Sequence, residues 1–368
     1  MRGFAFRGDR QIALLTKPTP VCGPREVLVR VRATAVCGSD LHYYRQSAQE
    51  RRAAADFYCG HEPVGVVAAV GADVRTVSLG DRVVVYHVGG CGHCSACDGG
   101  RFKDCPQAQQ HVMQRSRDGA NAEFVVVHER QALPLPDSVS FEAGAVLACS
   151  FGTAWAAVKQ TSAPPSSLAV WGLGPVGLNT VVIANLMGLR TVGIDLSGER
   201  REAAAELGCE VVDGSEPELT DILLDRTDGA GFNTVIETTG ATAVHHQAAT
   251  VTHRGGTIVL VGLGANSSIG PTREIILREL CVRGSWIFGV RDWPDILDFV
   301  LRNDIDLMRT VDRVTSIEHF RDAMSDADQG SMAKIVFSWP PNGLPDSLSH
   351  DPMTSRTTEP PNINLRSS

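Results

Sequence analysis

The sequence predicts an α/β protein in which a β-rich domain precedes a doubly wound parallel sheet. Short apolar segments separated by Gly and Pro fill the chain up to residue 147, and strand, Gly turn and helix patterns alternate after residue 151. A Gly-rich turn stands at 172–177. The 368 residues are 43% apolar and 21% charged, as in ordinary globular proteins, and their number predicts two or three domains.

Short apolar segments of strand length indicate the elements of the first part. These segments are 26–33, 64–70, 81–88 and 122–127. We expect residues 1–152 to form the β-rich domain.

Six apolar segments with helical patterns between them follow, and six is the number of strands in a complete dinucleotide-binding sheet. They are 168–173, 191–196, 210–213, 232–238, 256–263 and 282–288. We expect this second domain to span residues 153–288.

The last part of the chain shows a helical pattern at 293–302 and two strand-like segments at 311–315 and 333–338. We expect residues 289–339 to return to the first domain. The tail, 340–368, consists largely of Pro, Ser, Asn and Thr. We predict that it is disordered, because so few apolar residues cannot offset the entropy lost on ordering.

Charge and hydropathy exclude several classes of protein. The net charge is −8, from 34 basic and 42 acidic side chains, which argues against a nucleic-acid-binding protein. No run approaches the roughly 20 consecutive apolar residues of a membrane span. The first ten residues lack the apolar run of a secretory signal, so we expect a cytoplasmic protein whose partner is a small molecule.

Four closely spaced cysteines predict a structural zinc site. Cys91, Cys94, Cys97 and Cys105 form a C-x2-C-x2-C-x7-C pattern in a Gly-rich run, and four thiolates can close a tetrahedral zinc site. Four unrelated buried cysteines are the plain alternative, although a segment this polar rarely buries four thiols without a metal. An iron–sulfur cluster is less favoured, since the spacing differs from the common ferredoxin patterns.

The Gly-rich turn fits the G-x-G-x-x-G fingerprint of dinucleotide binding, with Gly172, Gly174 and Gly177 at the fixed positions and Pro175 and Val176 between them. The first Gly permits the tight turn, the second lets the backbone approach the pyrophosphate, and the third allows the following helix to pack closely on the strand. The helix N-terminus then faces the phosphates with its partial positive charge.

A carboxylate stands where the adenosine ribose of such a cofactor is bound. Asp195 ends the next strand, 23 residues after Gly172, and a carboxylate there accepts hydrogen bonds from the ribose hydroxyls and repels a 2′-phosphate. This favours NAD over NADP. Arg200 and Arg201 could partly accommodate a phosphate, and a solvated helix start explains Arg201 equally well.

A third group of residues completes a pattern that belongs to a known family. Taken singly, Cys37, His61 and Cys149 have plain explanations, since a Cys in an apolar run is usually a core residue and a lone His is usually just hydrogen-bonded. Here, however, they accompany a four-Cys segment and a nucleotide-binding turn. In this order the chain resembles the zinc-dependent alcohol dehydrogenases of the medium-chain dehydrogenase/reductase superfamily, over residues 1–338. The resemblance implies a GroES-like β-rich catalytic domain interrupted by a Rossmann domain, with the active site in the cleft between them.

The resemblance also implies roles for individual residues. Cys37, His61 and Cys149 match three ligands of a catalytic zinc with an open fourth position. The residues that match supporting roles are Asp40, which steadies the ligand His, Glu62, which lies behind the zinc, and Ser39 and His42, which form a proton relay. The family pattern therefore implies two zinc ions per chain, one catalytic and one structural, together with NAD.

The expected reaction is hydride transfer between NAD and an alcohol/carbonyl pair. Segment 37–44 resembles the polyol and threonine dehydrogenases more than the ethanol enzymes, so we expect a secondary alcohol or polyol. The polyol branch often has a carboxylate as third ligand, where this chain has Cys149. We also expect a homodimer or homotetramer, as is common in the family.

Two other functions would use part of this pattern. A non-catalytic NAD-binding sensor or scaffold would need only the four-Cys zinc site and the nucleotide turn. That function does not account for Cys37, His61, Cys149 and Ser39. A zinc-free enone reductase of the same superfamily would lack the catalytic ligands, which this chain contains.

Overall fold

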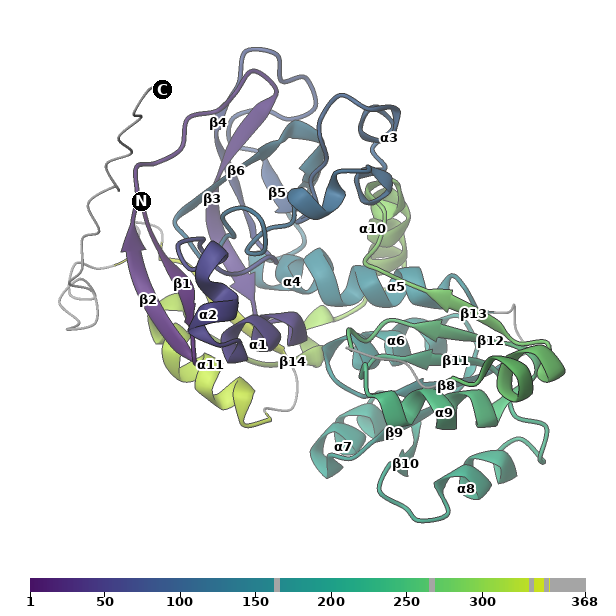
Figure 1. The fold of residues 1–368 in the computed structure, drawn as a ribbon. Coiled ribbons are helices and arrows are strands. Elements are labelled where there is room, and N and C mark those ends of the chain that lie inside the picture. Colours follow the sequence, from purple (N-terminus) through teal and green to yellow (C-terminus); the bar gives the residue numbers. More distant parts are fainter. Residues whose placement is uncertain (162–165, 265–268, 331–333, 341–343, 345–368) are drawn as a thin grey trace, which may run out of the picture.

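The computed structural model describes residues 1–161, 166–264, 269–330, 334–340 and 344. It confirms the predicted α/β class, with a β-rich part and a parallel sheet. Figure 1 shows these two parts side by side, with helices α4 (Phe141–Val146) and α5 (Gly152–Val158) running between them.

A seven-stranded sheet forms the core of the β-rich part, around the long central strand β3 (Glu26–Ala35). The strand order is β14-β15-β3-β4-β5-β7, and β6 pairs with β3. The other strands are β4 (Val64–Val70), β5 (Arg82–Val85), β6 (Phe124–His128), β7 (Ala132–Pro134), β14 (Val311–Ser316) and β15 (Lys334–Ser338). Because β15 pairs with β3, the segment Lys334–Ser338 lies in the first sheet.

The second sheet has six parallel strands in the order β10-β9-β8-β11-β12-β13. In chain order this is 3-2-1-4-5-6, the arrangement of a complete dinucleotide-binding fold, whose ligands lie where the order reverses, here between β8 and β11. The strands are β8 (Ser167–Trp171), β9 (Arg190–Asp195), β10 (Glu210–Asp213), β11 (Phe232–Glu237), β12 (Thr252–Leu260) and β13 (Cys281–Gly284).

The remaining helices and strands connect or cover these sheets. The helices from residue 175 onward include α6 (Pro175–Leu186), α7 (Gly198–Glu206), α8 (Leu219–Asp225), α9 (Thr242–Val251), α10 (Trp293–Arg302) and α11 (Phe320–Asp328). The elements before residue 100 include α1 (Gly38–Arg45), α2 (Ala48–Arg51), α3 (Ser95–Asp98) and the hairpin β1 (Arg2–Gly8) and β2 (Gln11–Thr16). Single turns lie at Arg52–Ala54, Phe102–Asp104, Ala108–Gln110, Glu129–Gln131, Pro271–Ile275, Ile276–Arg278, Val290–Asp292, Leu307–Thr310 and Ile317–His319.

Three predicted strands differ from the structure by three residues or more at an end. The segment expected at 81–88 forms strand β5 only from Arg82 to Val85. Strand β12 begins four residues before the expected 256–263 and ends three residues before its close. The sixth strand was expected at 282–288 but leaves the sheet after Gly284. The apolar residues that follow are buried for another reason, since Phe288 is fully buried and its carbonyl accepts a hydrogen bond at 2.7 Å from Oη of Tyr86 in the β-rich part.

A continuous helical stretch, Phe141–Val158, carries Cys149 and was not predicted. It consists of α4, a π-helical segment at Leu147–Phe151 and α5. The stretch is long and apolar enough to match a membrane span by length and composition, but 83% of it is buried inside the protein. Its apolar side chains are therefore covered by the protein's own core.

The predicted disorder of the tail falls mostly outside the described residues. Within the tail the structure describes Leu344, whose side chain is buried and whose N–H donates to Glu123 Oε1 at 3.0 Å. This leucine extends the core of the β-rich part beyond Trp339.

Candidate active site

Helix α1 begins at a residue that the sequence marks as a metal ligand. Cys37 caps the helix directly after strand β3, and its N–H donates to Asp40 Oδ2 at 2.8 Å. Asp40 lies in the first turn of α1, where a carboxylate is favoured by the partial positive charge of the helix N-terminus. The backbone of Cys37 is therefore held by its own helix.

The same carboxylate orients His61. Asp40 Oδ1 lies 3.0 Å from His61 Nδ1, and both side chains are almost fully buried. This contact directs Nε2 of His61 toward Cys149 Sγ, which lies 3.8 Å away. Burial lowers the pKa of His61, but the charge and hydrogen bond of Asp40, together with those of Cys37, outweigh burial and raise this pKa well above its ordinary value.

The three predicted ligands of the catalytic zinc come together from three distant segments. Cys37 Sγ and Cys149 Sγ are 3.9 Å apart, and the ligand atoms of Cys37, His61, Cys149 and Glu62 all lie within 4.8 Å of one another. A tetrahedral zinc ion with Zn–S bonds of about 2.3 Å separates two sulfur ligands by roughly 3.8 Å. The residues therefore fit a zinc ion.

The two thiols of this cluster are electrostatically coupled. A hydrogen bond with Cys149 lowers the pKa of Cys37 well below the ordinary value, and the same contact raises the pKa of Cys149. Two adjacent thiols share one proton more readily than they lose both, and a cation between them favours loss of both protons.

The four-Cys segment forms the second predicted cluster. The Sγ atoms of Cys91, Cys94, Cys97 and Cys105 lie within 4.8 Å of one another, with Cys94–Cys97 at 3.5 Å. The backbone N–H groups of Cys91 and Gln107 each donate to Cys105 Sγ at 3.4 Å. These donors favour a thiolate at Cys105, and the spacing of the four sulfur atoms fits a closed tetrahedral zinc site.

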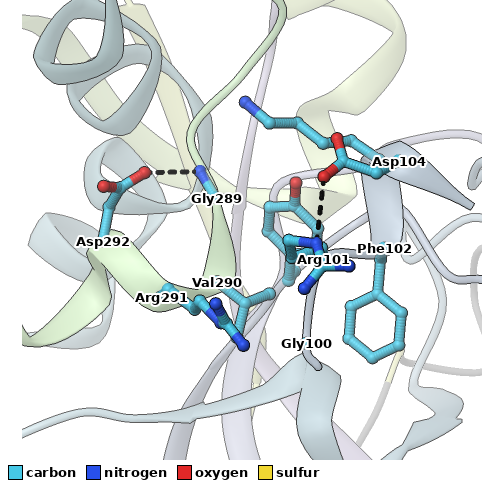
Figure 2. A pocket seen from close by; sticks show the side chains of 10 residues that line it. Gly100, Arg101, Phe102, Asp104, Gly289, Val290, Arg291 and Asp292 are labelled. Carbon is cyan, nitrogen blue, oxygen red and sulfur yellow. Dashed lines mark hydrogen bonds and ion pairs between the residues drawn. The ribbon is translucent and has the colours of Figure 1, made fainter. Parts of the chain in front are cut away.

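Close packing stabilises the four-Cys lobe, the segment 91–105 that contains the four cysteines. A Cβ on Gly90 would lie 2.3 Å from Cys97 Sγ, so only glycine fits there. A cavity of about 180 Å³ lies between the lobe and the segment before α10 (Figure 2). Arg291 Nε links the two by donating to the Gly99 carbonyl at 2.7 Å. No predicted site residue lines this cavity.

The Gly-rich turn has the geometry of a phosphate-binding turn. Gly172 has φ +90°, and a Cβ there would lie 2.6 Å from Thr238 Oγ1. A Cβ on Gly177 would lie 1.9 Å from the Gly172 carbonyl oxygen, whereas a Cβ on Gly174 meets nothing within 4 Å. Helix α6 begins directly after Gly174, with Pro175 in its first turn and Val176 next to it, so its N-terminus faces the open space beside Gly174.

Asp195 stands at the end of β9 beside this turn. Its carboxylate accepts the N–H groups of Leu173 at 2.7 Å and Ser197 at 2.9 Å, so it fixes the turn. Arg200 Nη1 lies 3.8 Å from Asp195. Arg201 is held by Asp213 at 2.6 Å and by two backbone carbonyls, which favours a structural role for Arg201 rather than contact with a phosphate.

Comparison with known proteins identifies the family. An alcohol dehydrogenase GroES-like domain matches residues 23–137, and a zinc-binding dehydrogenase domain matches residues 175–302. A sorbitol dehydrogenase of Bacillus subtilis is 31% identical over 333 residues, covering 89% of this chain and 94% of its own length. The chain belongs to the zinc-dependent alcohol dehydrogenases of the medium-chain dehydrogenase/reductase superfamily.

Two further relatives agree with this assignment. A probable D-xylulose reductase A of Aspergillus fumigatus is 30% identical, covering 87% of this chain and 90% of its own. The solved alcohol dehydrogenase of Thermus sp. ATN1 superposes with a TM-score of 0.84 at 26% identity, covering 92% and 99% of the two chains. The predicted resemblance is thus confirmed: the protein is an oxidoreductase, and nothing in these comparisons supports the non-catalytic alternative.

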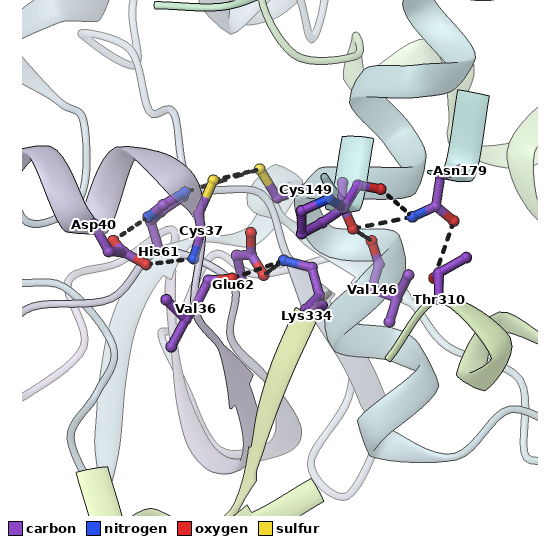
Figure 3. A network of polar contacts seen from close by, with 12 residues as sticks. Val36, Cys37, Asp40, His61, Glu62, Val146, Cys149, Asn179, Thr310 and Lys334 are labelled. Carbon is purple, nitrogen blue, oxygen red and sulfur yellow. Dashed lines mark hydrogen bonds and ion pairs between the residues drawn. The ribbon is translucent and has the colours of Figure 1, made fainter. Parts of the chain in front are cut away.

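The dehydrogenase also contains a buried charge pair that the sequence did not indicate. Lys334 on β15 is fully buried and lies beside Glu62, and its ammonium also donates to the Val36 carbonyl at 3.1 Å (Figure 3). Burial raises the pKa of Glu62 to about 7, and Lys334 opposes this shift. The sequence feature that could have indicated this pair is Lys334 itself, a lysine in the otherwise largely apolar strand β15.

Asn179 links the segment that carries Cys149 to the nucleotide-binding part of the dehydrogenase. This asparagine on α6 is buried, and its Nδ2 lies 3.5 Å from Ser150 Oγ, next to Cys149. Its Oδ1 accepts a hydrogen bond from Thr310 Oγ1 at 3.5 Å (Figure 3). These contacts fix the π-helical segment against helix α6.

The predicted relay residues lie on the first two turns of α1. Ser39 is half-buried and His42 is exposed, and neither belongs to the groups of ligand atoms. His87, a buried residue beside the cluster, was not singled out in the sequence analysis. The centroid of its ring lies 4.8 Å from that of His61. Burial lowers the pKa of His87 to about 3, so its imidazole is neutral.

Proposed function

We propose that this dehydrogenase oxidises a secondary alcohol or polyol with NAD, and reduces the matching carbonyl, at a zinc held by Cys37, His61 and Cys149. The observation that carries the proposal is geometric: ligand atoms from three distant segments lie 3.8–3.9 Å apart around Cys149. The four-Cys lobe would then hold the structural zinc.

The bound groups supply the chemistry that the side chains lack: zinc lowers the pKa of a hydroxyl group, and NAD accepts a hydride. Asp40 keeps His61 oriented with Nε2 free for the metal. Ser39 would receive the hydroxyl proton, and His42, exposed on the same helix, would release it to water. Glu62 and Lys334 would balance charge behind the ligands.

The turn at 172–177 would bind the pyrophosphate at the start of α6, and Asp195 would accept hydrogen bonds from the adenosine ribose. Arg200, within 4 Å of Asp195, could also contact this end of the cofactor. A carboxylate at this position supports NAD rather than NADP. The similarity to a sorbitol dehydrogenase and a xylulose reductase favours a substrate with neighbouring hydroxyl groups.

The assembly belongs to the same proposal. We propose that residues 1–152 and 289–339 make up the catalytic domain, with residues 153–288 as the nucleotide-binding domain between them. The pairing of β15 with β3 supports the return of the chain. We further propose a cytoplasmic homodimer or homotetramer.

Metal analysis with reciprocal variants tests the zinc assignment. The wild type should contain two zinc ions per chain. Cys149→Ala should lose one ion and nearly all turnover, whereas Cys97→Ala should lose the other ion, and Cys209→Ala, a buried cysteine outside both clusters, should keep both. Two zinc ions and unchanged turnover in Cys149→Ala would contradict the proposal.

A substrate survey tests the reaction. Secondary alcohols, polyols and threonine would be supplied with NAD or NADP, and nicotinamide absorbance followed. We expect the highest kcat/KM for a secondary alcohol or polyol with NAD. Turnover of primary alcohols alone, or a preference for NADP, would contradict the proposal.

A further inference from the structure

Gln114 has an unusual backbone conformation beside the proposed catalytic zinc site. Its φ is +56°, in the left-handed region that side chains other than glycine seldom adopt, and its side chain is buried. Such strain persists only where surrounding contacts outweigh it. The contacts of Gln114 therefore indicate what holds it there.

The side-chain amide of Gln114 lies among the groups that support His61. The N–H of Gly60 donates to Gln114 Oε1 at 2.9 Å, which fixes the orientation of the amide. Gln114 Nε2 consequently faces the site, where it donates to Asp40 Oδ1 and lies 2.9 Å from His61 Nδ1.

The backbone of Gln114 is also held. Its carbonyl accepts a hydrogen bond from the buried Arg51 Nη2 at 2.8 Å. Next to it, the N–H of Met113 donates to the carbonyl of His87 at 3.2 Å. The segment that leaves the four-Cys lobe is thus fastened to the layer behind the proposed ligands.

This arrangement places three N–H donors on one carboxylate. Asp40 Oδ2 accepts from the backbone of Cys37, and Asp40 Oδ1 faces both His61 Nδ1 and the amide of Gln114. A histidine that binds metal through Nε2 carries its hydrogen on Nδ1. The amide nitrogen of Gln114 cannot accept that hydrogen, so only Asp40 can.

We propose that Gln114 is a positioning residue for the catalytic metal, which holds Asp40 and Gly60 and through them sets the orientation of His61. This proposal rests on the proposed role of His61 as a ligand. Loss of the amide would let the Asp40 carboxylate rotate, and changes in such supporting groups typically cost about 10- to 100-fold in metal affinity.

Gln114→Glu is the direct test, because it keeps the acceptor for Gly60 but replaces the donor to Asp40 with a second carboxylate. Zinc-loaded protein would be mixed with a chromophoric chelator, and the release of the two zinc ions followed over time. We expect one ion to leave about 10- to 100-fold faster, while the other leaves as in the wild type. Gln110→Glu is the matched control, since Gln110 is exposed near the same segment.

A second variant separates metal positioning from folding. Gln114→Gly removes the amide, and the relief of the backbone strain offsets part of the stability lost with the hydrogen bonds of the side chain. Its melting temperature should therefore fall only moderately and stay above the temperature of the assay, while one ion still leaves faster. The absorption bands of Co²⁺ at the catalytic site should shift in both variants. Wild-type release and spectra in Gln114→Gly would overturn the proposal, whether or not Gln114→Glu folds.

His61→Ala distinguishes failure of this inference from failure of the proposed site. If His61→Ala keeps both zinc ions, the ligand assignment itself is wrong. If His61→Ala loses one ion while both Gln114 variants behave as the wild type, the ligand assignment stands and Gln114 has only a structural role.

Discussion

Lys334 Nζ lies 2.5 Å from Glu62 Oε2, and neither side chain is exposed to solvent. The pair joins strand β15 to the residue that follows His61. The ammonium also lies close enough to Cys37 and Cys149 for their charges to raise its pKa, after the larger opposing effect of burial and the effect of Glu62. The returning strand therefore supplies the positive charge behind two thiols and a carboxylate.

Removal of this ammonium should destabilise the fold. Lys334→Met leaves the Glu62 carboxylate buried without a partner, which should lower the free energy of unfolding by about 3–5 kcal/mol. Urea unfolding of the zinc-loaded protein measures the effect. Arg302→Met is the control, because it breaks an exposed pair with Asp298 on α10 and should cost less than about 0.5 kcal/mol.

The double variant tests the cause. Lys334→Met combined with Glu62→Gln removes both charges and should regain a large part of the loss, because no unpaired charge remains buried. Equal unfolding midpoints for Lys334→Met and the wild type would show that the pair contributes nothing to stability.

Two glycines of the nucleotide turn should respond differently to alanine. Gly174→Ala places a methyl group in open space, so the fold should be unaffected, but that space is where the pyrophosphate would lie. NADH should bind with a Kd about 5- to 100-fold higher, as expected for a steric cost of roughly 1–3 kcal/mol. Gly177→Ala forces a methyl group against the Gly172 carbonyl and should lower the melting temperature instead.

NADH fluorescence titration and thermal unfolding distinguish the two effects. Gly284→Ala is the control, because its Cβ also meets nothing within 4 Å and it lies at the end of strand β13. If NADH binds Gly174→Ala and Gly284→Ala equally tightly, the pyrophosphate does not approach Gly174.

Local patterns made much of the fold predictable. Parallel strands alternate with helices within short stretches, so all six strands of the second sheet were located, and Glu210–Asp213 had its observed bounds. The spacing of Cys91, Cys94, Cys97 and Cys105 is likewise local. The distant set Cys37, His61 and Cys149 was recognised through its resemblance to a family, and the structure then brought these atoms together.

Contacts between distant segments could not be predicted. Lys334 and Glu62 are 272 residues apart, and nothing in either segment indicates the partner. Gln114 stands in a segment without periodicity, and its left-handed backbone is set by contacts with residues far along the chain. The apolar run 286–288 looked like a continuation of the sixth strand because burial against the first domain requires the same residue types as burial in a sheet.

A surface cluster of Asp328, Arg10 and Arg45 should make the free energy of unfolding depend on pH. Asp328, at the end of α11, accepts from Arg10 Nε at 2.7 Å and is paired with Arg45, which ends α1. The hydrogen bond from Arg10, with a smaller one from Arg45, lowers the pKa of Asp328 below its ordinary value. The cluster thus fastens α1, which carries Ser39 and His42, to α11.

Because the pKa of Asp328 is lower in the folded protein, the unfolded chain binds its proton more readily. The stabilisation is therefore complete above the pKa of the unfolded chain, about 3.9, and is lost as the pH falls through the lower pKa of the folded protein. Asp328→Asn should lower the free energy of unfolding by about 0.5–1 kcal/mol at pH 7, a small value because both arginines are about half exposed. The difference from the wild type should shrink below pH 4.

Asp137→Asn, at a fully exposed carboxylate, is the control. A difference in the free energy of unfolding between Asp328→Asn and the wild type that stays constant from pH 7 to pH 3 would exclude the ion pair as its source.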